Sequence, residues 1–494
     1  MLAGIDIGTT GCKITVYDRK GNFKFKAYRG YETTRNNSAH EINALDIYNG
    51  VKEIIKEATE KYSIKAIGID SFGEAFVMLD ENDSPLIPIM TYTDFRGVKE
   101  IDELVEKLGA DKISSITGLK PHPMYSLPKI MWIKKNQPEI FKKAKHILLM
   151  EDYIIYMLTG NKVIDYTLAT RSMAFDINNL CWSKEILDAA ELDVNLFAQT
   201  KKSGSSAGFL KESIKKELNI NDNITITAVG HDQIAAAIGA GVIGEGMAVD
   251  GAGTVECITP VYKSLDKKDV LLNNNYAIVP FLNNDFVTYA FSYTSGSLVN
   301  WFMNNFSHKI SAEPQYLGKN ASEFDILESG FIDGPSKLLV LPHFAGAATP
   351  YMDTSSKGAI IGLTLETTPS HIYQGILEGI AYEMKVNLDL LKKAGIKPKR
   401  LIATGGGANS LKWLQIKADI LNLPIVKLNS IESGSRGCAI MAGLSCGIFN
   451  TIEDGIKAMI KKSCILRPNK TKHAQYMDVY KKYKKLYKNV KELL

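Results

Sequence analysis

Two segments rich in glycine and threonine, roughly half a chain apart, have the residue types that bind phosphate. The first is Gly4-Ile5-Asp6-Ile7-Gly8-Thr9-Thr10-Gly11 and the second is Asp250-Gly251-Ala252-Gly253-Thr254. Each follows a short apolar run that predicts a strand, and each precedes another β-rich run. A tight turn between two strands exposes backbone N–H groups and a hydroxyl at one point, which suits a phosphate. Two such turns facing each other could hold a nucleotide's phosphates, which predicts ATP chemistry in a cleft between two similar halves.

Two charged residues flank the first segment. Lys13 follows the turn and could reach a terminal phosphate, although an exposed strand lysine is an equal alternative. Asp6 ends an apolar strand, where a buried carboxylate is costly unless it is paired or close to a metal ion. We therefore expect Asp6 to bind Mg²⁺ through water, with a purely structural role as the alternative.

Asp232 is the candidate for the carboxylate that phosphoryl transfer requires near the attacking hydroxyl. It lies between a predicted strand at 224–229 and a run of small residues at 234–239 that predicts a tightly packed helix. An Asp in this position is often only a helix cap, so capping remains open here. The neighbouring His231 is either a catalytic partner or a hydrogen-bonded histidine beside the site.

A further glycine-rich turn, Thr404-Gly405-Gly406-Gly407-Ala408-Asn409-Ser410, separates a predicted strand at 401–404 from a predicted helix at 411–421. Glycines there let backbone lie close to a flat ligand such as adenine and ribose. Three glycines alone are a weak signal, because strand-to-helix turns often contain them.

The elements around these residues predict two domains, since a chain of 494 residues is too long for one core. The first half reads as strands at 2–7, 13–18 and 23–28, a helix at 44–61 and a strand at 66–70. The second half repeats the theme with strands at 247–249 and 255–259, a helix from Thr368 to about Gly395, and the strand at 401–404. We place the boundary in the glycine-rich stretch 239–247, giving domains 1–243 and 244–494. That stretch suits a hinge and close packing equally well.

Composition excludes several classes of protein. A hydrophobic share of 45% with 23% charged residues is typical of a soluble globular protein. The net charge of +5 is only a mild excess of basic residues. The densest basic stretch lies on a predicted C-terminal helix, where tyrosines at helical spacing indicate a buried face with lysines exposed around it. We therefore expect no nucleic-acid role. The six cysteines lack metal-ligand spacing and suit a reducing compartment. Without a signal peptide or a membrane-length apolar run, we expect a cytoplasmic protein that does not bind a membrane.

Taken together, the segments resemble the FGGY family of carbohydrate kinases over nearly the whole chain. The run from Met124 to Asn136 is similar to the family's first signature. The run Gly358–Leu363, followed by His371–Glu378, resembles the second, with Gly375 in place of the usual Ala or Ser.

The resemblance implies an α/β fold of two actin-like, ribonuclease-H-type domains, with ATP and sugar in the interdomain cleft. It implies that Asp232 is the general base and Gln233 a neighbouring sugar contact. The residues that match the family's nucleotide-binding positions are Gly8, Thr9, Thr10, Lys13, Gly253, Thr254, Gly296, Asn300, Gly406, Gly407 and Asn409.

Two loops of the first half should set sugar specificity, namely 71–75 and 92–96, which we call the sugar loops. Xylulokinases resemble Gln-Met-His-Gly and Trp-Asn-Asp-x-x-Arg here, and this chain departs at both, with Glu74 where those enzymes have His. It also leans toward rhamnulokinase and fuculokinase relatives. Glu74, Asp94 and Arg96 would line a pocket for a polyol chain, because carboxylates accept and Arg donates hydrogen bonds. A surface ion pair is the alternative for these three residues.

The sequence therefore predicts an ATP- and Mg²⁺-dependent kinase that phosphorylates a terminal or primary hydroxyl of a ketose-type sugar. The family resemblance is compatible with a homodimer. The alternatives are an ATPase of the actin or heat-shock type, which has no small-molecule acceptor, and a sugar-sensing protein without turnover.

Overall fold

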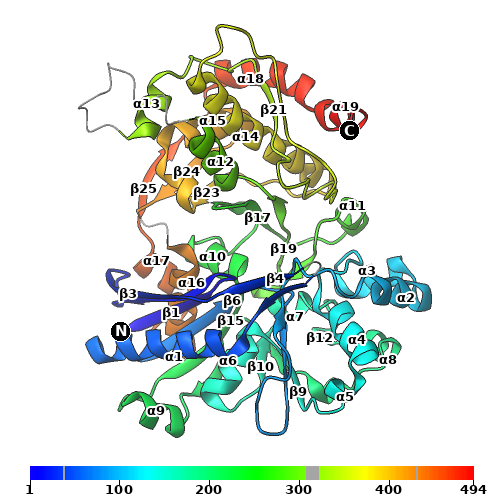
Figure 1. The fold of residues 1–494 in the computed structure, drawn as a ribbon. Coiled ribbons are helices and arrows are strands. Elements are labelled where there is room, and N and C mark those ends of the chain that lie inside the picture. The colour runs from blue at the N-terminus through cyan, green and yellow to red at the C-terminus, as the bar shows by residue number, and fades with distance from the viewer. Residues whose placement is uncertain (37–38, 307–321, 430–431) are drawn as a thin grey trace. The chain divides into compact units, whose positions relative to one another are not determined.

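The computed structural model describes residues 1–36, 39–306, 322–429 and 432–494 of the chain (Figure 1). Its residues group into two compact units. Unit 1 contains residues 1–243, 277–287 and 432–461, and unit 2 contains residues 244–276, 288–431 and 462–494. Each unit is a mixed α/β structure, as the sequence predicts. The two units differ from the predicted domains 1–243 and 244–494, because residues 277–287 and 432–461 belong to unit 1.

Unit 1 is built on a six-stranded sheet in the order β14-β15-β6-β1-β2-β3. β1 pairs antiparallel with β2, and β2 with β3, whereas β1–β6 and β6–β15 are parallel. The first phosphate turn, residues 8–11, therefore joins two adjacent antiparallel strands. The strands are β1 (Leu2–Ile7), β2 (Gly11–Tyr17), β3 (Phe23–Gly30), β6 (Ala66–Ser71), β14 (Ser205–Phe209) and β15 (Thr225–His231).

Helices cover both faces of this sheet, and glycines set how closely they approach. α16 (Ser433–Ser445) lies so close to β1 and β6 that a Cβ on Gly4 or Gly68 would overlap its backbone. α1 (Ala44–Lys61) packs on the opposite face against β2 and β3. Figure 1 shows α16 and α17 (Ile452–Met459), in orange, beside the blue N-terminal strands. The C-terminal part of the chain thus completes the core of unit 1.

The rest of unit 1 consists of short strands and helices. The small strand pairs and the three-stranded sheet use β4 (Thr33–Asn36), β5 (Ala39–Ile42), β7 (Phe76–Leu79), β8 (Ile89–Met90), β9 (His146–Leu149), β10 (Val163–Asp165), β11 (Phe175–Asp176), β12 (Cys181–Trp182), β13 (Gln199–Lys201), β18 (Val279–Pro280) and β19 (Phe286–Val287). The helices are α2 (Val98–Leu108), α3 (Ala110–Thr117), α4 (Ser126–Asn136), α5 (Pro138–Phe141), α6 (Met150–Thr159), α7 (Tyr166–Thr170), α8 (Lys184–Ala189), α9 (Glu212–Leu218) and α10 (Asp232–Gly239).

Unit 2 repeats the same strand pattern. β16 pairs antiparallel with β17 and parallel with β23, β23 pairs parallel with β24, and β25 closes that edge in the antiparallel sense. β20 pairs with the other side of β17. The second phosphate turn, residues 251–254, lies at the β16–β17 connection. The strands are β16 (Met247–Ala252), β17 (Glu256–Tyr262), β20 (Ala290–Ser292), β23 (Arg400–Thr404), β24 (Ile425–Leu428) and β25 (Lys462–Leu466), with β21 (Leu339–Leu341) and β22 (Ala359–Ile361) in a separate pair.

The longest helix of unit 2 is α14 (Pro369–Lys393), which Thr368 caps through a capping box and which has a proline in its first turn, as the sequence predicts. The remaining helices are α11 (Lys268–Asn273), α12 (Gly296–Phe306), α13 (Glu323–Ser329), α15 (Leu411–Leu421), α18 (Lys470–Tyr483) and α19 (Leu486–Lys491). Tyr476, Tyr480 and Tyr483 of α18 are buried and pack around Tyr382, which confirms the predicted tyrosine stripe.

Gly239, at the start of the glycine-rich stretch, packs closely in unit 1. A Cβ there would overlap the backbone of Ser433, so close packing accounts for this glycine. Among the described residues, no helix combines the length and the apolar character needed to cross a bilayer.

Candidate functional site

The first phosphate turn is held by its own backbone and by two tyrosines. The Gly8 N–H donates to the Gly11 carbonyl at 3.0 Å. The Tyr31 hydroxyl donates to the Gly8 carbonyl, and the Tyr28 hydroxyl to the Thr10 carbonyl. Since Thr10 is exposed and Thr9 half-buried, the turn is accessible to a ligand at its tip.

Lys13 is not a free strand lysine. Its Nζ lies 3.0 Å from Asp6 Oδ2 and 3.2 Å from Glu432 Oε2. Although burial opposes the charged amine, the two carboxylates raise the pKa of Lys13 above its usual value. The lysine therefore stays positive near the first phosphate turn. Glu432 could not be found from the sequence, because it comes from the start of α16.

A second carboxylate lies beside Asp6. Asp70 is its partner in the parallel pairing of β1 and β6 and is fully buried. Its Oδ2 lies 3.0 Å from Cys438 Sγ, and its Oδ1 has no hydrogen-bond partner among the described residues. Burial, and then the charge of Asp6, raise the pKa of Asp70 well above the ordinary value.

The residues around Asp6 fit a weakly held Mg²⁺ ion. The described residues contain no cluster of three or more His, Cys, Asp or Glu side chains that could hold a metal alone. Mg²⁺ is usually bound by one or two carboxylates together with water and substrate phosphates. The carboxylate of Asp6 is 20% exposed and lies at the end of β1, directly before the phosphate turn. Such a donor suits an ion that arrives with the nucleotide.

Asp232 is the first residue of α10, directly after β15. The N-cap position belongs to His231, whose side chain makes no capping hydrogen bond, so the capping alternative for Asp232 is wrong. Burial, and then the charge of Asp6, raise the pKa of Asp232 to about 7. About a third of its side chain, 35%, is still exposed. A carboxylate of this kind can accept a proton near neutral pH.

A neutral histidine lies beside this carboxylate. His231 Nε2 lies 3.4 Å from Asp232 Oδ1. Burial, and then the positive charge of Arg171, lower the pKa of His231 to about 3, so the imidazole is neutral. The His231 N–H donates to Thr167 Oγ1 at 3.0 Å, and the Thr167 hydroxyl donates to Asp165 at 3.0 Å. Asp165 and Thr167 carry no motif that sequence reasoning could have recognised.

The first sugar loop places Glu74 in an unusual environment. Glu74 adopts a left-handed backbone conformation with φ of 64° and is buried. Its carboxylate accepts a hydrogen bond of 2.5 Å from Arg171 Nε, and the guanidinium lies 5.3 Å from the Tyr125 ring centre. The partner of Glu74 is therefore a buried arginine from the end of α7, which the sequence did not indicate.

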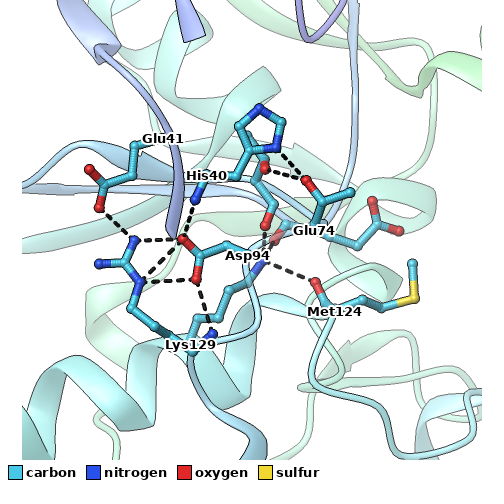
Figure 2. Close-up of polar contacts among 9 residues, drawn as sticks. His40, Glu41, Glu74, Asp94, Met124 and Lys129 are labelled. Atoms are coloured by element: carbon cyan, nitrogen blue, oxygen red, sulfur yellow. Dashed lines mark hydrogen bonds and ion pairs between the residues drawn. The ribbon is translucent and has the colours of Figure 1, made fainter. Parts of the chain in front are cut away.

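The second sugar loop has its charges paired with one another (Figure 2). Asp94 is fully buried and accepts hydrogen bonds from the Arg96 guanidinium and from the His40 N–H at 3.0 Å. Arg96 also donates to Glu41 at 2.5 Å. Although burial opposes the charged form, hydrogen bonds from Arg96 lower the pKa of Asp94. Direct sugar contacts by these residues stay predictions, as does the one for the half-buried Gln233.

Unit 2 brings its seven predicted nucleotide-binding residues to one place. A pocket of about 760 Å³ is lined by Gly253, Thr254, Gly296, Asn300, Gly406, Gly407 and Asn409. Tyr373 and Trp413 supply aromatic surface to the same pocket. A Cβ on Gly407 would collide with the Trp413 ring, so glycine keeps the turn close to the helix behind it. The pocket is large enough for a nucleoside and has the polar and apolar groups that such ligands need.

A buried ion cluster supports the second phosphate turn from behind. Lys417 Nζ lies 2.9 Å from Asp250 Oδ2 and 2.9 Å from Glu256 Oε1. The Ser295 hydroxyl donates to the other oxygen of Glu256 at 3.0 Å. Asp250 and Glu256 lie on either side of the turn, so Lys417 fixes both of its ends. No sequence motif singles out this lysine, which lies in the middle of α15.

Comparisons with known proteins match nearly the whole chain. Models of the N-terminal and C-terminal domains of the FGGY family of carbohydrate kinases match residues 1–239 and 252–446. The chain is 29% identical to the xylulose kinase of Lactococcus lactis, covering 99% of this chain and 97% of the relative. It is 28% identical to the glycerol kinase of Borrelia duttonii, covering 94% of both. The fold is similar to that of the ligand-bound xylulose kinase of Lactobacillus acidophilus, with a TM-score of 0.88 at 23% identity over 99% of this chain and 98% of that one.

Proposed function

Because the chain belongs to the FGGY family of carbohydrate kinases, we propose that it transfers the terminal phosphoryl group of ATP to a primary hydroxyl of a ketose-type sugar. Membership makes it a sugar kinase that uses ATP; the ketose and the roles of individual residues are the proposal.

Asp232 acts as the general base. The sugar oxygen attacks the γ-phosphorus, the bond from that phosphorus to the ADP oxygen breaks, and the hydroxyl proton passes to Asp232. The observation that carries this assignment is the place of Asp232 at the start of α10, where its carboxylate remains partly exposed; burial and the charge of Asp6 raise its pKa to about 7. A base whose pKa lies near the working pH is partly deprotonated and still binds a proton strongly, and both properties favour proton transfer.

The phosphates are assigned to the two phosphate turns and to Lys13, whose amine stays charged beside Asp6. Asp6 would hold a Mg²⁺ ion through water, and that ion would neutralise charge on the phosphates. The adenosine is assigned to the pocket lined by Gly406, Gly407 and Asn409. Its glycine backbone and the flat ring of Trp413 support this assignment.

The sugar is assigned to the two sugar loops, with Glu74 and Arg96 as the nearest charged groups. Xylulose kinases are among the relatives that match over the full length, which supports a ketose. Glu74 and its partner Arg171 carry a hydrogen-bond acceptor and hydrogen-bond donors, which are the groups that bind sugar hydroxyls.

The repeated strand order of the two units supports an actin-like fold, with two ribonuclease-H-type domains that each carry one phosphate turn. We propose 1–243 as the main part of the sugar domain and 244–494 as that of the nucleotide domain, with residues 277–287 and 432–461 packed into unit 1. Assembly as a homodimer stays a prediction.

The test is ADP release over a panel of ketoses, with glycerol and gluconate included, for the natural protein and for Asp232→Asn. We expect ketose-dependent release that falls by a factor of about 10² or more in the variant, while ATP binding is retained. Near-normal turnover of Asp232→Asn would show that another group takes the proton. ATP hydrolysis that no sugar stimulates would instead favour an ATPase without an acceptor.

A further inference from the structure

Lys129, on α4, is a fully buried lysine, and within the described residues its amine donates to three backbone carbonyl oxygens. Its Nζ donates to the carbonyls of Glu74 at 2.8 Å, Thr91 at 2.8 Å and Met124 at 3.0 Å (Figure 2). These carbonyls come from three separate segments. One is in the first sugar loop, one directly precedes the second sugar loop, and one precedes α4.

The geometry uses the full donor capacity of the amine. An ammonium group has three N–H donors and no acceptor, so three carbonyls satisfy it completely. Within the described parts of the chain, no carboxylate oxygen lies within 4.0 Å of this Nζ. A buried ammonium without an ion pair is costly, and burial lowers the pKa of Lys129 to about 7, even though the charges of Glu74 and Asp94 oppose this. Hydrogen bonds from a charged donor are the interactions that offset such a cost.

Two of the three carbonyls that Lys129 holds belong to structures that orient a sugar-loop side chain. Glu74 has the left-handed backbone described above, so its side-chain direction depends on how its peptide groups are held. Thr91 O also accepts the Asp94 N–H at 3.1 Å, which closes the turn that carries Asp94. One amine thus fixes the first loop and the start of the second in a single relative position.

We propose that Lys129 is a positioning residue that locks the two sugar loops to each other, and thereby sets the affinity for the sugar without contacting it. The proposal rests on the proposed function, because it takes these loops to be the sugar site. It explains why a side chain with such a desolvation cost occupies the core between them.

The test compares Lys129→Met and Lys129→Gln with Lys134→Met. Methionine keeps the apolar stem and removes every donor, whereas glutamine keeps two donors on a shorter stem. Lys134 is the matched control, because it lies on the same helix and donates to a backbone carbonyl, that of Glu191 at 2.6 Å, away from the sugar loops. Steady-state kinetics would give the KM for the sugar and for ATP separately, and hydrogen exchange would follow the peptides covering 71–76 and 91–96.

We expect Lys129→Met to raise the sugar KM by about tenfold to a hundredfold, since a shift of about 1 Å in a positioning group has effects of that size. The ATP KM should change less than about twofold, because the nucleotide pocket of unit 2 keeps its supports. Lys129→Gln should show a smaller rise, and Lys134→Met should match the natural protein. In Lys129→Met, amide hydrogen exchange should accelerate in the two sugar-loop peptides and stay unchanged in the peptide covering 404–413.

An unchanged sugar KM in either folded Lys129 variant would overturn the proposal. Equal increases in both KM values, with faster exchange throughout unit 1, would also overturn it, because they would show general destabilisation. If Lys129→Met does not fold, Lys129→Gln decides on the same criteria. Failure of the proposed function is a separate result: the natural protein would then release no ADP with any sugar of the panel.

Discussion

Replacing Lys417 with Met should destabilise unit 2 more than any other single lysine substitution that we consider. The amine, Asp250 and Glu256 are each no more than 1% exposed, and both ion-pair distances are 2.9 Å. The variant leaves two buried carboxylates facing each other without a cation. Breaking a buried ion pair from one side costs about 3–5 kcal/mol of unfolding free energy. We expect a loss in that range.

The loss should depend on pH with a definite sign. Burial raises the pKa of Glu256 to about 7 even with Lys417 present, and Lys417 acts in the opposite direction. Without the lysine, the folded state holds protons on this carboxyl at pH values where the unfolded chain has released them. A carboxyl whose folded pKa is raised contributes stability that is lost as the pH rises through that pKa. The variant should therefore recover part of its stability when the pH falls from about 8 to about 6.

Urea unfolding followed by tryptophan fluorescence is a suitable assay, because the Trp413 ring lies 4.8 Å from Lys417 Nζ. Lys412→Met is the control on the same helix, since Lys412 donates to the Glu328 carbonyl at the surface and should matter by no more than about 0.5 kcal/mol. Adding Glu256→Gln to Lys417→Met should restore part of the loss. A loss below about 1 kcal/mol, or one that is equal at pH 6 and pH 8, would refute the reasoning about this cluster.

Three further predictions concern unit 1. Gly437→Ala should lower the free energy of unfolding by about 1–3 kcal/mol or more, because the new Cβ would overlap the Ala235 carbonyl between α10 and α16. Urea unfolding measures this loss, and an unchanged midpoint would contradict the packing argument. The kcat should fall about tenfold per pH unit below pH 7 and level off above it, because Asp232 must be deprotonated to act as the base; a flat profile from pH 5.5 to 8 would exclude that role. Arg171→Met should leave the buried Glu74 without its arginine and lower the thermal midpoint of unit 1, whereas Arg171→Lys should lower that midpoint less. Calorimetry compares the two variants. Equal midpoints for Arg171→Met and the natural protein would contradict the importance of this pairing.

Local structure could be predicted where it depends on neighbouring residues. The helices at 44–61 and 411–421 have the predicted bounds, because apolar spacing and capping residues are properties of short windows. The seven residues of unit 2 that we predict to bind nucleotide also line one pocket. Five of them, Gly253, Thr254, Gly406, Gly407 and Asn409, lie in the two turns that the sequence pattern identifies, whereas Gly296 and Asn300 were placed by the family resemblance alone.

Contacts between distant segments could not be predicted. Glu432 meets Lys13, and Arg171 meets Glu74, although nothing in the sequence around either residue indicates its partner. The contacts of Lys129 were hidden for a different reason. Its acceptors are backbone carbonyls, which every residue has, so the residue types at these positions do not indicate the contact.

The packing of α16 against the N-terminal sheet has a consequence during synthesis. The first 240 residues leave the ribosome long before residues 433–445 exist, so the sheet face that carries Gly4 and Gly68 stays bare while unit 2 is being translated. Domains usually fold as units from the N-terminus, and this one cannot finish in that order. The nascent protein must carry this uncovered sheet face until residues 433–445 emerge, so the topology favours chaperone binding at that face during synthesis.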